Sequence, residues 1–304
     1  MADALVRKTE IAPRISIARK AMAKEDMPPK SDLKRGSAIY DNKRARQTLD
    51  PKLMTSYHKQ AQWSEFVKLK EIIGETHAFL NRPLSFLDIG VGYARIPLWL
   101  SQVATWDKVG KYVGIDNGDF CVAQSRRIVS AKGIDDKVEV LRFDALDLSN
   151  DSSSVDTFGK NGFDLAICTY FTGGDFKPDE IELKTDKNGL IVDYDAGALT
   201  PNRNFIKVFR GAYGLLRDGG KIVIGSLYHD SDLAKKIQED FYRRCAMRVI
   251  TSIKDLFTAT LEGFWSERFD ENRIHEYLSW ASPNKVNVIP LDDYNFALMV
   301  TIDK

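Results

Sequence analysis

The chain has 304 residues, of which 43% are hydrophobic and 29% are charged, and its formal net charge is +1. These values are ordinary for a soluble globular protein and leave room for one large α/β domain or two small ones. No apolar run reaches the roughly 18 residues that a membrane span needs, and no secretory signal is evident, so we expect a cytoplasmic protein without a membrane partner. The three cysteines are scattered, which predicts neither a disulfide framework nor a metal site.

The positive charge is concentrated near the N-terminus, where residues 1–46 hold 12 Lys or Arg and 6 Asp or Glu. Such a basic arm, assigned here to residues 1–45, either contacts nucleic acid or an acidic partner, or is a solvated and partly disordered tail. We expect the tail. Residues 46–304 are then expected to form the folded domain.

A helical pattern begins at about Thr55, and residues 46–82 are interpreted as a helical N-terminal lid. The apolar residues of this segment fall largely on one face of the predicted helix. They are Tyr57, Trp63, Phe66, Val67, Leu69, Ile72 and Ile73.

Strand-like and helical segments alternate from residue 84 to residue 228, which predicts right-handed βαβ units and a mainly parallel sheet. Residues 217–220, Arg-Asp-Gly-Gly, are interpreted as the glycine-rich end of the last of these helices. Strands are expected at 84–89, 111–116, 137–143, 163–170 and 221–228, and helices at 94–105, 119–132 and 202–217.

The last part of the chain departs from this alternation. Two apolar segments, 285–290 and 296–302, are joined by only five residues, too few for a crossover helix, so they must be antiparallel. Two insertions also stand out. Residues 171–200 contain alternating segments around a glycine turn at 186–189, which predicts a β-hairpin, and residues 231–263 predict a helix followed by a connector.

The stretch FLDIGVGYARIPLWL, residues 86–100, is a glycine-rich strand-to-helix turn of the kind that holds a nucleotide. A dinucleotide fold needs a third glycine where this chain has Arg95, and a phosphate-binding P-loop needs a Gly-Lys-Ser/Thr that is missing. The arrangement Asp88-Ile-Gly90-Val-Gly92-Tyr-Ala94 instead resembles the first motif of class I S-adenosylmethionine-dependent methyltransferases.

This resemblance implies an α/β fold with a seven-stranded, mainly parallel sheet, an antiparallel C-terminal hairpin and helices on both faces. It implies S-adenosylmethionine as the cofactor and S-adenosylhomocysteine as the product. The side chain of Arg95 either faces solvent or an acid, or contacts the cofactor carboxylate. The cofactor-binding residues that the resemblance implies are Asp88, Gly90, Gly92, Asp116 and Asn117 for the amino-acid and ribose portions, Asp144 and Ala145 for the adenine, and Thr169 beside them.

The end of the fourth strand, Cys168-Thr-Tyr-Phe-Thr-Gly-Gly-Asp, lacks the Pro-Pro that shapes the slot of enzymes methylating nucleic-acid bases, so a nucleic-acid acceptor is disfavoured. We expect methyl transfer to nitrogen or oxygen of a small molecule such as an amino acid, an amine or a secondary metabolite. Tyr170 and His229 are the catalytic candidates. The candidates for acceptor binding are Tyr57, Trp63, Tyr170, Phe171, Asp175 and Tyr228, whereas His58 is expected to be structural or exposed.

Two alternatives remain open at this point. Related enzymes move the aminocarboxypropyl group of the same cofactor, or cyclise it, and release methylthioadenosine. A noncatalytic binding module that uses the basic arm is the other alternative. The predicted hairpin at 181–194 is either a lid or a contact in a homodimer.

Overall fold

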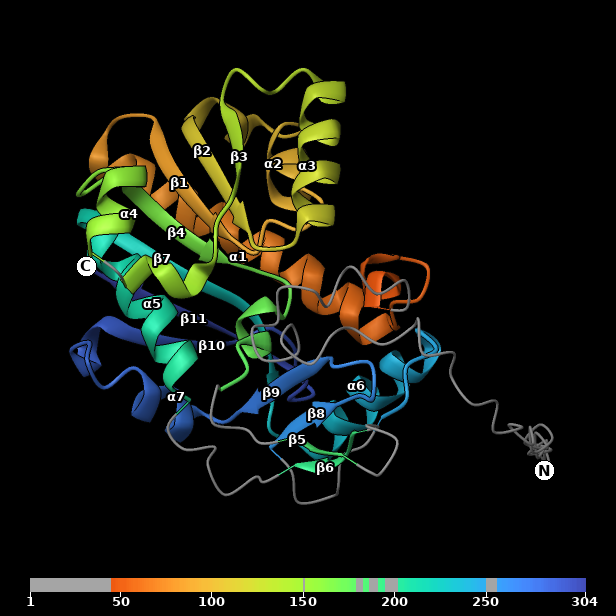
Figure 1. Cartoon of the computed structure of the whole chain (residues 1–304). Helices are drawn as coiled ribbons and strands as arrows, with labels where there is room; N and C mark the ends of the chain where they lie inside the picture. Colours follow the sequence, from red (N-terminus) through yellow and green to blue (C-terminus); the bar gives the residue numbers. More distant parts are fainter. Residues whose placement is uncertain (1–44, 150, 179–182, 186–190, 195–201, 250–255) are drawn as a thin grey trace, which may run out of the picture.

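The computed structural model describes residues 45–149, 151–178, 183–185, 191–194, 202–249 and 256–304. The predicted basic arm, except for Ala45, therefore lies outside the described residues. A seven-stranded path in the order β10-β11-β7-β4-β1-β2-β3 forms the centre of the molecule (Figure 1). The strands are β1 (Leu84–Ile89), β2 (Val109–Asp116), β3 (Val138–Arg142), β4 (Phe163–Cys168), β7 (Leu216–His229), β10 (Val286–Pro290) and β11 (Ala297–Asp303).

The pairing directions confirm the predicted fold class. β1 pairs in parallel with β2 and β4, β2 with β3, and β4 with β7. β11 is antiparallel both to β7 and to β10, as the short link between the last two segments requires. Five of the six residues of β1 are buried, which explains why most of this strand is apolar in the sequence.

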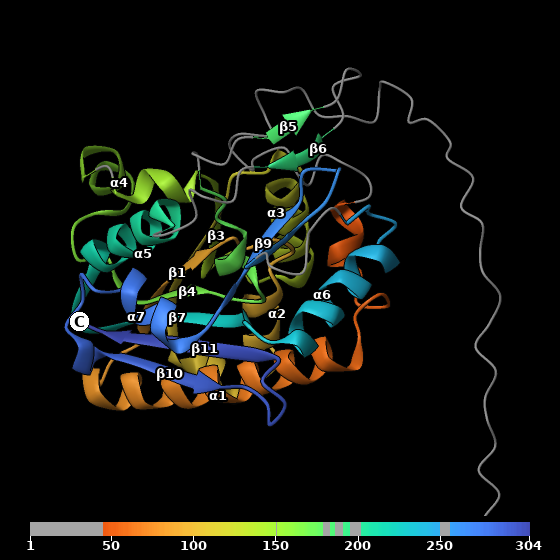
Figure 2. The same cartoon turned by 90° about the horizontal axis from the view of Figure 1, so that it is seen from below.

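Helices cover both faces of the sheet (Figure 2). Adjacent residues of a strand point to opposite faces, so Phe86 belongs to one core cluster and Leu87 to the other. The first cluster lies under α1 (Ser56–Leu80), α2 (Arg95–Leu100), α3 (Asp119–Lys132) and α6 (Asp232–Arg244). The second lies under α5 (Arg203–Leu215) and α7 (Glu271–Tyr277), with α4 (Asp151–Phe158) beside them.

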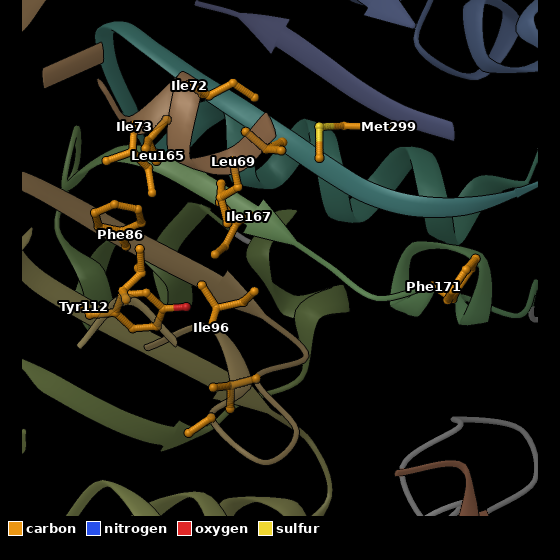
Figure 3. Close-up of a cluster of buried hydrophobic side chains, with 14 of the residues drawn as sticks. Leu69, Ile72, Ile73, Phe86, Ile96, Tyr112, Leu165, Ile167, Phe171 and Met299 are labelled. Carbon is orange, nitrogen blue, oxygen red and sulfur yellow. The ribbon is translucent and has the colours of Figure 1, made fainter. Parts of the chain in front are cut away.

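Helix α1 packs against the sheet, and Figure 3 shows its residues Leu69, Ile72 and Ile73 in one apolar cluster with side chains of β1 and β4. Its buried residues are His58, Ala61, Glu65, Leu69, Ile72, Ile73 and Thr76. The predicted apolar face was therefore partly wrong, because Trp63 is 67% exposed and Val67 is 39% exposed. Of the predicted lid, only the first turn of this helix and the residues before it border the cavity described below.

The helix ends agree with simple capping rules. The side chain of Thr55 accepts a hydrogen bond from the backbone N–H of His58, which starts α1 one residue after the predicted position. Asn81 adopts a left-handed conformation (φ 49°) and ends the helix.

The interpretation of residues 217–220 as a helix end was wrong. Helix α5 ends at Leu215, and these four residues belong to β7. Between the pairs Phe163–Leu216 and Leu165–Lys221 the register advances two residues on β4 and five on β7, so the segment is a bulge. Gly219 has φ +77° there, which explains the glycine.

The first insertion contains the predicted hairpin, whereas the second leads into more strand than expected. β5 (Leu183–Thr185) and β6 (Ile191–Tyr194) pair antiparallel and confirm the predicted hairpin, whose turn lies outside the described residues. Helix α6 is also confirmed. The predicted connector instead leads into β8 (Phe257–Ala259), which pairs with β9 (Trp265–Phe269), and β9 extends the sheet beside the end of β7. In the part of the chain that the structure describes, no helix is long and apolar enough to cross a membrane.

A buried carboxylate joins three strands at the amino-terminal edge of the sheet. Asp164 of β4 accepts two hydrogen bonds from Arg82, at 2.8 and 2.6 Å, and one from the backbone N–H of Ser85 at 2.8 Å. Arg217 donates to both carboxylate oxygens at 3.2 Å. Burial alone would raise the pKa of Asp164, but these donors hold it below its ordinary value.

We expect Asp164→Asn to destabilise the protein by about 1–3 kcal/mol, because hydrogen bonds to a charged group contribute that much while both arginines keep partial access to water. Urea denaturation at pH 7 measures the change. The stabilisation by Asp164 is present above the unfolded pKa and is lost as pH falls through the lower folded pKa, so the wild type and the variant should converge in acid. The exposed Asp136→Asn is the matched control, and an equal loss in the two variants would contradict the expectation.

Candidate active site

A single cavity brings together the carboxyl ends of β1, β2 and β4, where ligands bind in open α/β sheets. The space between its walls, counted together with the open mouth, is about 920 Å³. The described residues that line it are Thr48, Leu49, Met54, His58, Asp88, Gly90, Val91, Gly92, Tyr93, Arg95, Ile96, Asp116, Thr169, Tyr170, Phe171, Thr172, Asp175, Tyr228, Phe241, Tyr242 and Phe264.

The glycine turn after β1 forms the floor of this cavity. The backbone N–H groups of Gly90 and Val91 donate to the carbonyl of Ile115 on β2, at 2.9 and 3.0 Å, and fix the turn to the sheet. Gly90 has φ +74°, and a Cβ there would lie 2.5 Å from Thr172 Cγ2. Gly92 has φ +54°, and a Cβ there would have only the Gly90 carbonyl within 4 Å, so its backbone is open to a ligand.

Asp88, at the end of β1, is fully buried and incompletely paired. Its Oδ2 accepts a hydrogen bond from the Tyr112 hydroxyl at 2.6 Å, whereas its Oδ1 is buried without a hydrogen-bond partner among the described residues. Burial raises the pKa of Asp88 to about 7, against the opposing effects of the Tyr112 hydrogen bond and the Arg95 charge. A buried acceptor without a donor, in a cavity wall, is suited to a cationic or N–H group of a ligand.

Asp116, at the end of β2, holds the glycine turn and faces the same cavity. Its carboxylate accepts the N–H of Gly92 at 3.1 Å and the N–H of Gly118 at 2.9 Å. Burial raises its pKa to about 6, and these two hydrogen bonds oppose the shift. Each oxygen still has a free lone pair, so the carboxylate can accept two hydroxyls of a ligand.

Three of the predicted cofactor residues lie beside this carboxylate but outside the cavity lining. Asn117 follows Asp116 directly. Asp144 and Ala145 stand at the end of β3, where the N–H of Phe143 donates to the Asp116 carbonyl at 3.0 Å. Asp144 Oδ1 accepts the N–H of Leu146 at 3.0 Å, which starts a 3₁₀ turn at Ala145–Ser149. Their contact with an adenine ring stays a prediction.

Arg95 faces an acid, and the acid comes from α1. Its Nη2 lies 3.2 Å from Oε1 of the fully buried Glu65 and donates to the Thr169 hydroxyl at 3.1 Å. The guanidinium carbon stands 4.4 Å from the ring centroid of Tyr170. Arg95 Nη1 is buried without a hydrogen-bond partner among the described residues, so a donor remains for a ligand.

The backbone after β4 is held in an uncommon conformation. Tyr170 and Phe171 have φ of 56° and 63°, in the left-handed region that favours glycine, and Ala94 in the glycine turn has φ 55°. Such residues cost on the order of 1–3 kcal/mol each and persist where the surroundings impose them. Here Glu65 Oε2 accepts the N–H of Tyr170 at 2.9 Å. The same carboxylate therefore holds both Arg95 and the strained loop.

An aromatic wall closes the side of the cavity opposite the glycine turn. Phe171 stacks on Tyr228 with 4.0 Å between ring centroids, and the imidazole of His58 packs against both. His58 Nε2 lies 2.8 Å from the Tyr228 hydroxyl and Nδ1 lies 2.7 Å from the Thr55 hydroxyl. Burial and, to a smaller extent, the Arg244 charge lower the pKa of His58 to about 3, so the imidazole is neutral at physiological pH.

Some of the remaining site residues predicted from the sequence line the cavity, and others do not. Thr169, Tyr170, Phe171, Asp175 and Tyr228 line the cavity together with Asp88, Gly90, Gly92 and Asp116. Tyr57, Trp63 and His229 do not line it: Tyr57 packs on Tyr294 and Phe296, Trp63 is mostly exposed, and His229 ends β7 with its backbone bonded to the Phe296 carbonyl. Tyr228, one residue earlier, points into the cavity because neighbouring residues of a strand face opposite sides.

With this geometry established, comparison with known proteins identifies the family. A family profile described as "Methyltransferase domain" matches residues 80–281, two thirds of the chain. The chain belongs to the methyltransferase-domain family. This membership confirms the resemblance to class I S-adenosylmethionine-dependent methyltransferases that the glycine turn predicted, and with it S-adenosylmethionine as the cofactor of the family.

Two solved methyltransferase structures are similar to this chain at low sequence identity. 1,6-Didemethyltoxoflavin-N1-methyltransferase from Burkholderia thailandensis, solved with 1,6-didemethyltoxoflavin and S-adenosylhomocysteine, has a TM-score of 0.50 and 14% identity, covering 95% of this chain and 93% of that chain. Magnesium protoporphyrin IX methyltransferase from Synechocystis PCC 6803, solved with S-adenosylhomocysteine, has a TM-score of 0.49 and 11% identity. The match covers 90% of this chain and 100% of that chain. No curated protein matches the sequence significantly.

Several lining residues of this methyltransferase domain were missed in the sequence. Thr48, Met54, Phe241, Tyr242 and Phe264 come from segments with no motif, and nothing local distinguishes them from core residues. His58 and Glu65 did carry a signal, because two polar residues seven positions apart interrupt the apolar stripe of α1. A buried polar residue in such a stripe needs a partner, and both partners lie in the site.

We expect Glu65→Gln to destabilise the methyltransferase domain by about 1–3 kcal/mol, because the amide can still accept the Tyr170 N–H but leaves the partly buried Arg95 without its counter-charge. Urea denaturation at pH 7.5 measures the difference. Glu71→Gln on the same helix removes an exposed ion pair with Lys68 and should cost under about 1 kcal/mol. Equal effects of the two substitutions would contradict the role assigned to Glu65.

Proposed function

We propose that this protein transfers the methyl group of S-adenosylmethionine to a nitrogen or oxygen atom of a small-molecule acceptor. The observation that carries the proposal is a pair of unsatisfied buried groups in one cavity. Asp88 Oδ1 lacks a donor and Arg95 Nη1 lacks an acceptor among the described residues. An amino-acid end group, with its ammonium and carboxylate, supplies both missing partners.

The other cofactor contacts fit the same orientation. Asp116 has lone pairs for the two ribose hydroxyls, and the open backbone of Gly92 lets the ribose approach the turn closely. The end of β3, with Asp144 and Ala145, lies next to Asp116 and is the edge at which we expect the adenine. When bound, the cofactor supplies an activated methyl group on a sulfonium.

The aromatic wall serves the acceptor in this proposal. Phe171 and Tyr228 are stacked, buried and fixed by the neutral His58, so they can orient an acceptor and exclude water from the reacting atoms. Because the sulfonium is already activated, in-line placement contributes much of the rate. Tyr170 also lines the cavity: its ring packs on the Arg95 guanidinium, and its buried hydroxyl has no hydrogen-bond partner among the described residues.

The nucleoside product tests the proposal directly. Purified protein is incubated with S-adenosylmethionine and pools of amino acids, amines and phenols, and the nucleoside formed is identified by mass spectrometry. S-adenosylhomocysteine is expected, and Asp116→Ala should weaken cofactor binding at least tenfold, since it removes charged hydrogen bonds worth roughly 1.5–3 kcal/mol. Methylthioadenosine would instead establish aminocarboxypropyl transfer or cyclisation. Absence of cofactor binding in calorimetry would favour the noncatalytic alternative.

The affinity for S-adenosylhomocysteine should depend on pH through Asp88. Because its pKa is raised to about 7, Asp88 is protonated in the free protein below that pH and must ionise to bind the ligand ammonium. Affinity in calorimetry should therefore fall as pH decreases from 8 to 6, approaching tenfold per unit below 7. Asp88→Asn should lower the affinity at pH 8 at least tenfold and flatten this dependence.

The stability of the free protein provides the control for folding. The pKa of Asp88 is near 4 in the unfolded chain and about 7 in the folded protein. Between these two pH values the folded protein binds the proton of Asp88 more tightly than the unfolded chain does. The free energy of unfolding of the wild type should therefore decrease as pH rises from about 4 to about 7. Asp88→Asn avoids the buried charge and should be no less stable than the wild type at pH 8. An unchanged pH dependence of binding in this variant would contradict the role of Asp88.

A further inference from the structure

The acceptor side of the cavity contains a carboxylic acid that the proposed cofactor contacts do not use. Asp175 ends the 3₁₀ turn Thr172–Asp175, which follows the strained residues after β4. The turn is packed tightly against the sheet. A Cβ on Gly173 would lie 2.9 Å from the side chains of Ile224 and Leu227, and a Cβ on Gly174 would lie 2.9 Å from the Glu267 carbonyl. Asp175 is therefore held in a fixed position in the cavity wall.

One oxygen of the Asp175 carboxyl group accepts no hydrogen bond from the described residues. This oxygen, Oδ1, is buried. Burial raises the pKa of Asp175 well above its ordinary value, and the neighbouring Ser266 hydroxyl opposes this shift. Among the described lining residues Arg95 is the one Lys or Arg, and it is bound to Glu65 and Thr169. No cation of the described cavity wall therefore compensates Asp175.

Besides His58 and Tyr93, six aromatic residues line the same cavity: Tyr170, Phe171, Tyr228, Phe241, Tyr242 and Phe264. Aromatic faces attract cations, and the attraction increases when the cation is removed from water. A buried carboxyl group in an aromatic-lined cavity favours an ammonium over a neutral hydroxyl, because the ammonium pairs with the ionised carboxylate and is also attracted by the aromatic faces.

We propose that the acceptor is an amine with an apolar body, whose protonated nitrogen is anchored by Asp175 among these rings. The inference rests on the proposed function and names its substrate class. Asp175 first accepts a proton from the ammonium, which leaves a neutral amine with a free lone pair. That lone pair forms the new N–C bond to the methyl group, the C–S electron pair remains on sulfur, and the products are an N-methylammonium and S-adenosylhomocysteine. The proton on Asp175 then passes to solvent.

The raised pKa of Asp175 supports the proton step, because a carboxylate whose basicity is closer to that of an amine is a more effective proton acceptor. The neutral His58 is less suited to this step, since burial keeps its pKa near 3 and both its nitrogens already contact hydroxyl groups. Tyr228 and Tyr242 also have pKa values raised by burial, so they remain neutral donors beside the acceptor.

Matched nitrogen and oxygen probes test the inference. The complex with S-adenosylhomocysteine is titrated in calorimetry with 2-phenylethylamine and with 2-phenylethanol, and turnover is followed with methyl-labelled S-adenosylmethionine and pools of arylalkylamines and the corresponding alcohols. We expect the amine to bind at least tenfold more tightly than the alcohol, and label to enter the amine pool. Preference for the alcohol, equal binding, or label absent from the amine pool would each overturn the inference.

Two variants assign the effect to the acceptor side. Asp175→Asn keeps the shape of the side chain and should abolish the amine preference and reduce amine turnover at least a hundredfold, while S-adenosylhomocysteine affinity stays within twofold. Phe241→Leu keeps an apolar side chain without the ring and should weaken amine binding several-fold. Asp293→Asn, exposed in the turn before β11, is the matched control and should change nothing. Amine turnover retained by Asp175→Asn overturns the inference, whereas loss of S-adenosylhomocysteine binding by the wild type would overturn the proposed function itself.

Discussion

The buried carboxylate of Glu65 is the interaction on which the site depends. Helix α1, the helix after the glycine turn and the loop after β4 are three separate pieces of chain, and Glu65 contacts the last two from the first, through Arg95 and the Tyr170 N–H. A Cβ on Gly225 would lie 2.5 Å from Glu65 Oε2, so β7 needs a glycine to admit this carboxylate. The position of Arg95 relative to the aromatic wall is fixed by that single group.

This arrangement explains why strained residues surround the cavity. Ala94, Tyr170 and Phe171 adopt left-handed conformations at the two loops that meet over the sheet edge. No local preference of the sequence stabilises these conformations, so packing and the Glu65 carboxylate must do so. Together with the end of β1, these loops place two buried atoms in one cavity, Asp88 Oδ1 and Arg95 Nη1, which have no hydrogen-bond partner among the described residues. A site built this way is preorganised, because its polar groups are placed before any ligand arrives.

The sequence predicted the sheet well, because the central strands are buried on both faces and therefore appear as continuous apolar runs. The resemblance also indicated Asp88, Gly92 and Asp116, which the structure brings together in one cavity at the strand ends, and their contacts with the cofactor stay a prediction. Prediction from the sequence failed where polar residues of one segment pair with distant ones. The Tyr170 N–H that Glu65 binds is 105 residues away, and the Tyr228 hydroxyl that His58 contacts is 170 residues away. Without those partners, a helix carrying buried His58 and Glu65 appeared to present Trp63 and Val67 to the core. The sequence did indicate Tyr170, Phe171, Asp175 and Tyr228, which line the cavity, but it gave no sign of Phe241, Tyr242 or Phe264.

The order of the strands also has a consequence for how the protein is made. β11 lies between β7 and β10, and Ala297 pairs with Tyr228, 69 residues before it (297 − 228 = 69). In a growing chain β7 is complete while that edge is still unpaired, and an unpaired edge of apolar strand is prone to wrong partners. Phe296, just before β11, packs against His58, Phe171 and Tyr228. During synthesis, the glycine turn therefore leaves the ribosome well before Phe296, the residue that completes the packing of the aromatic wall.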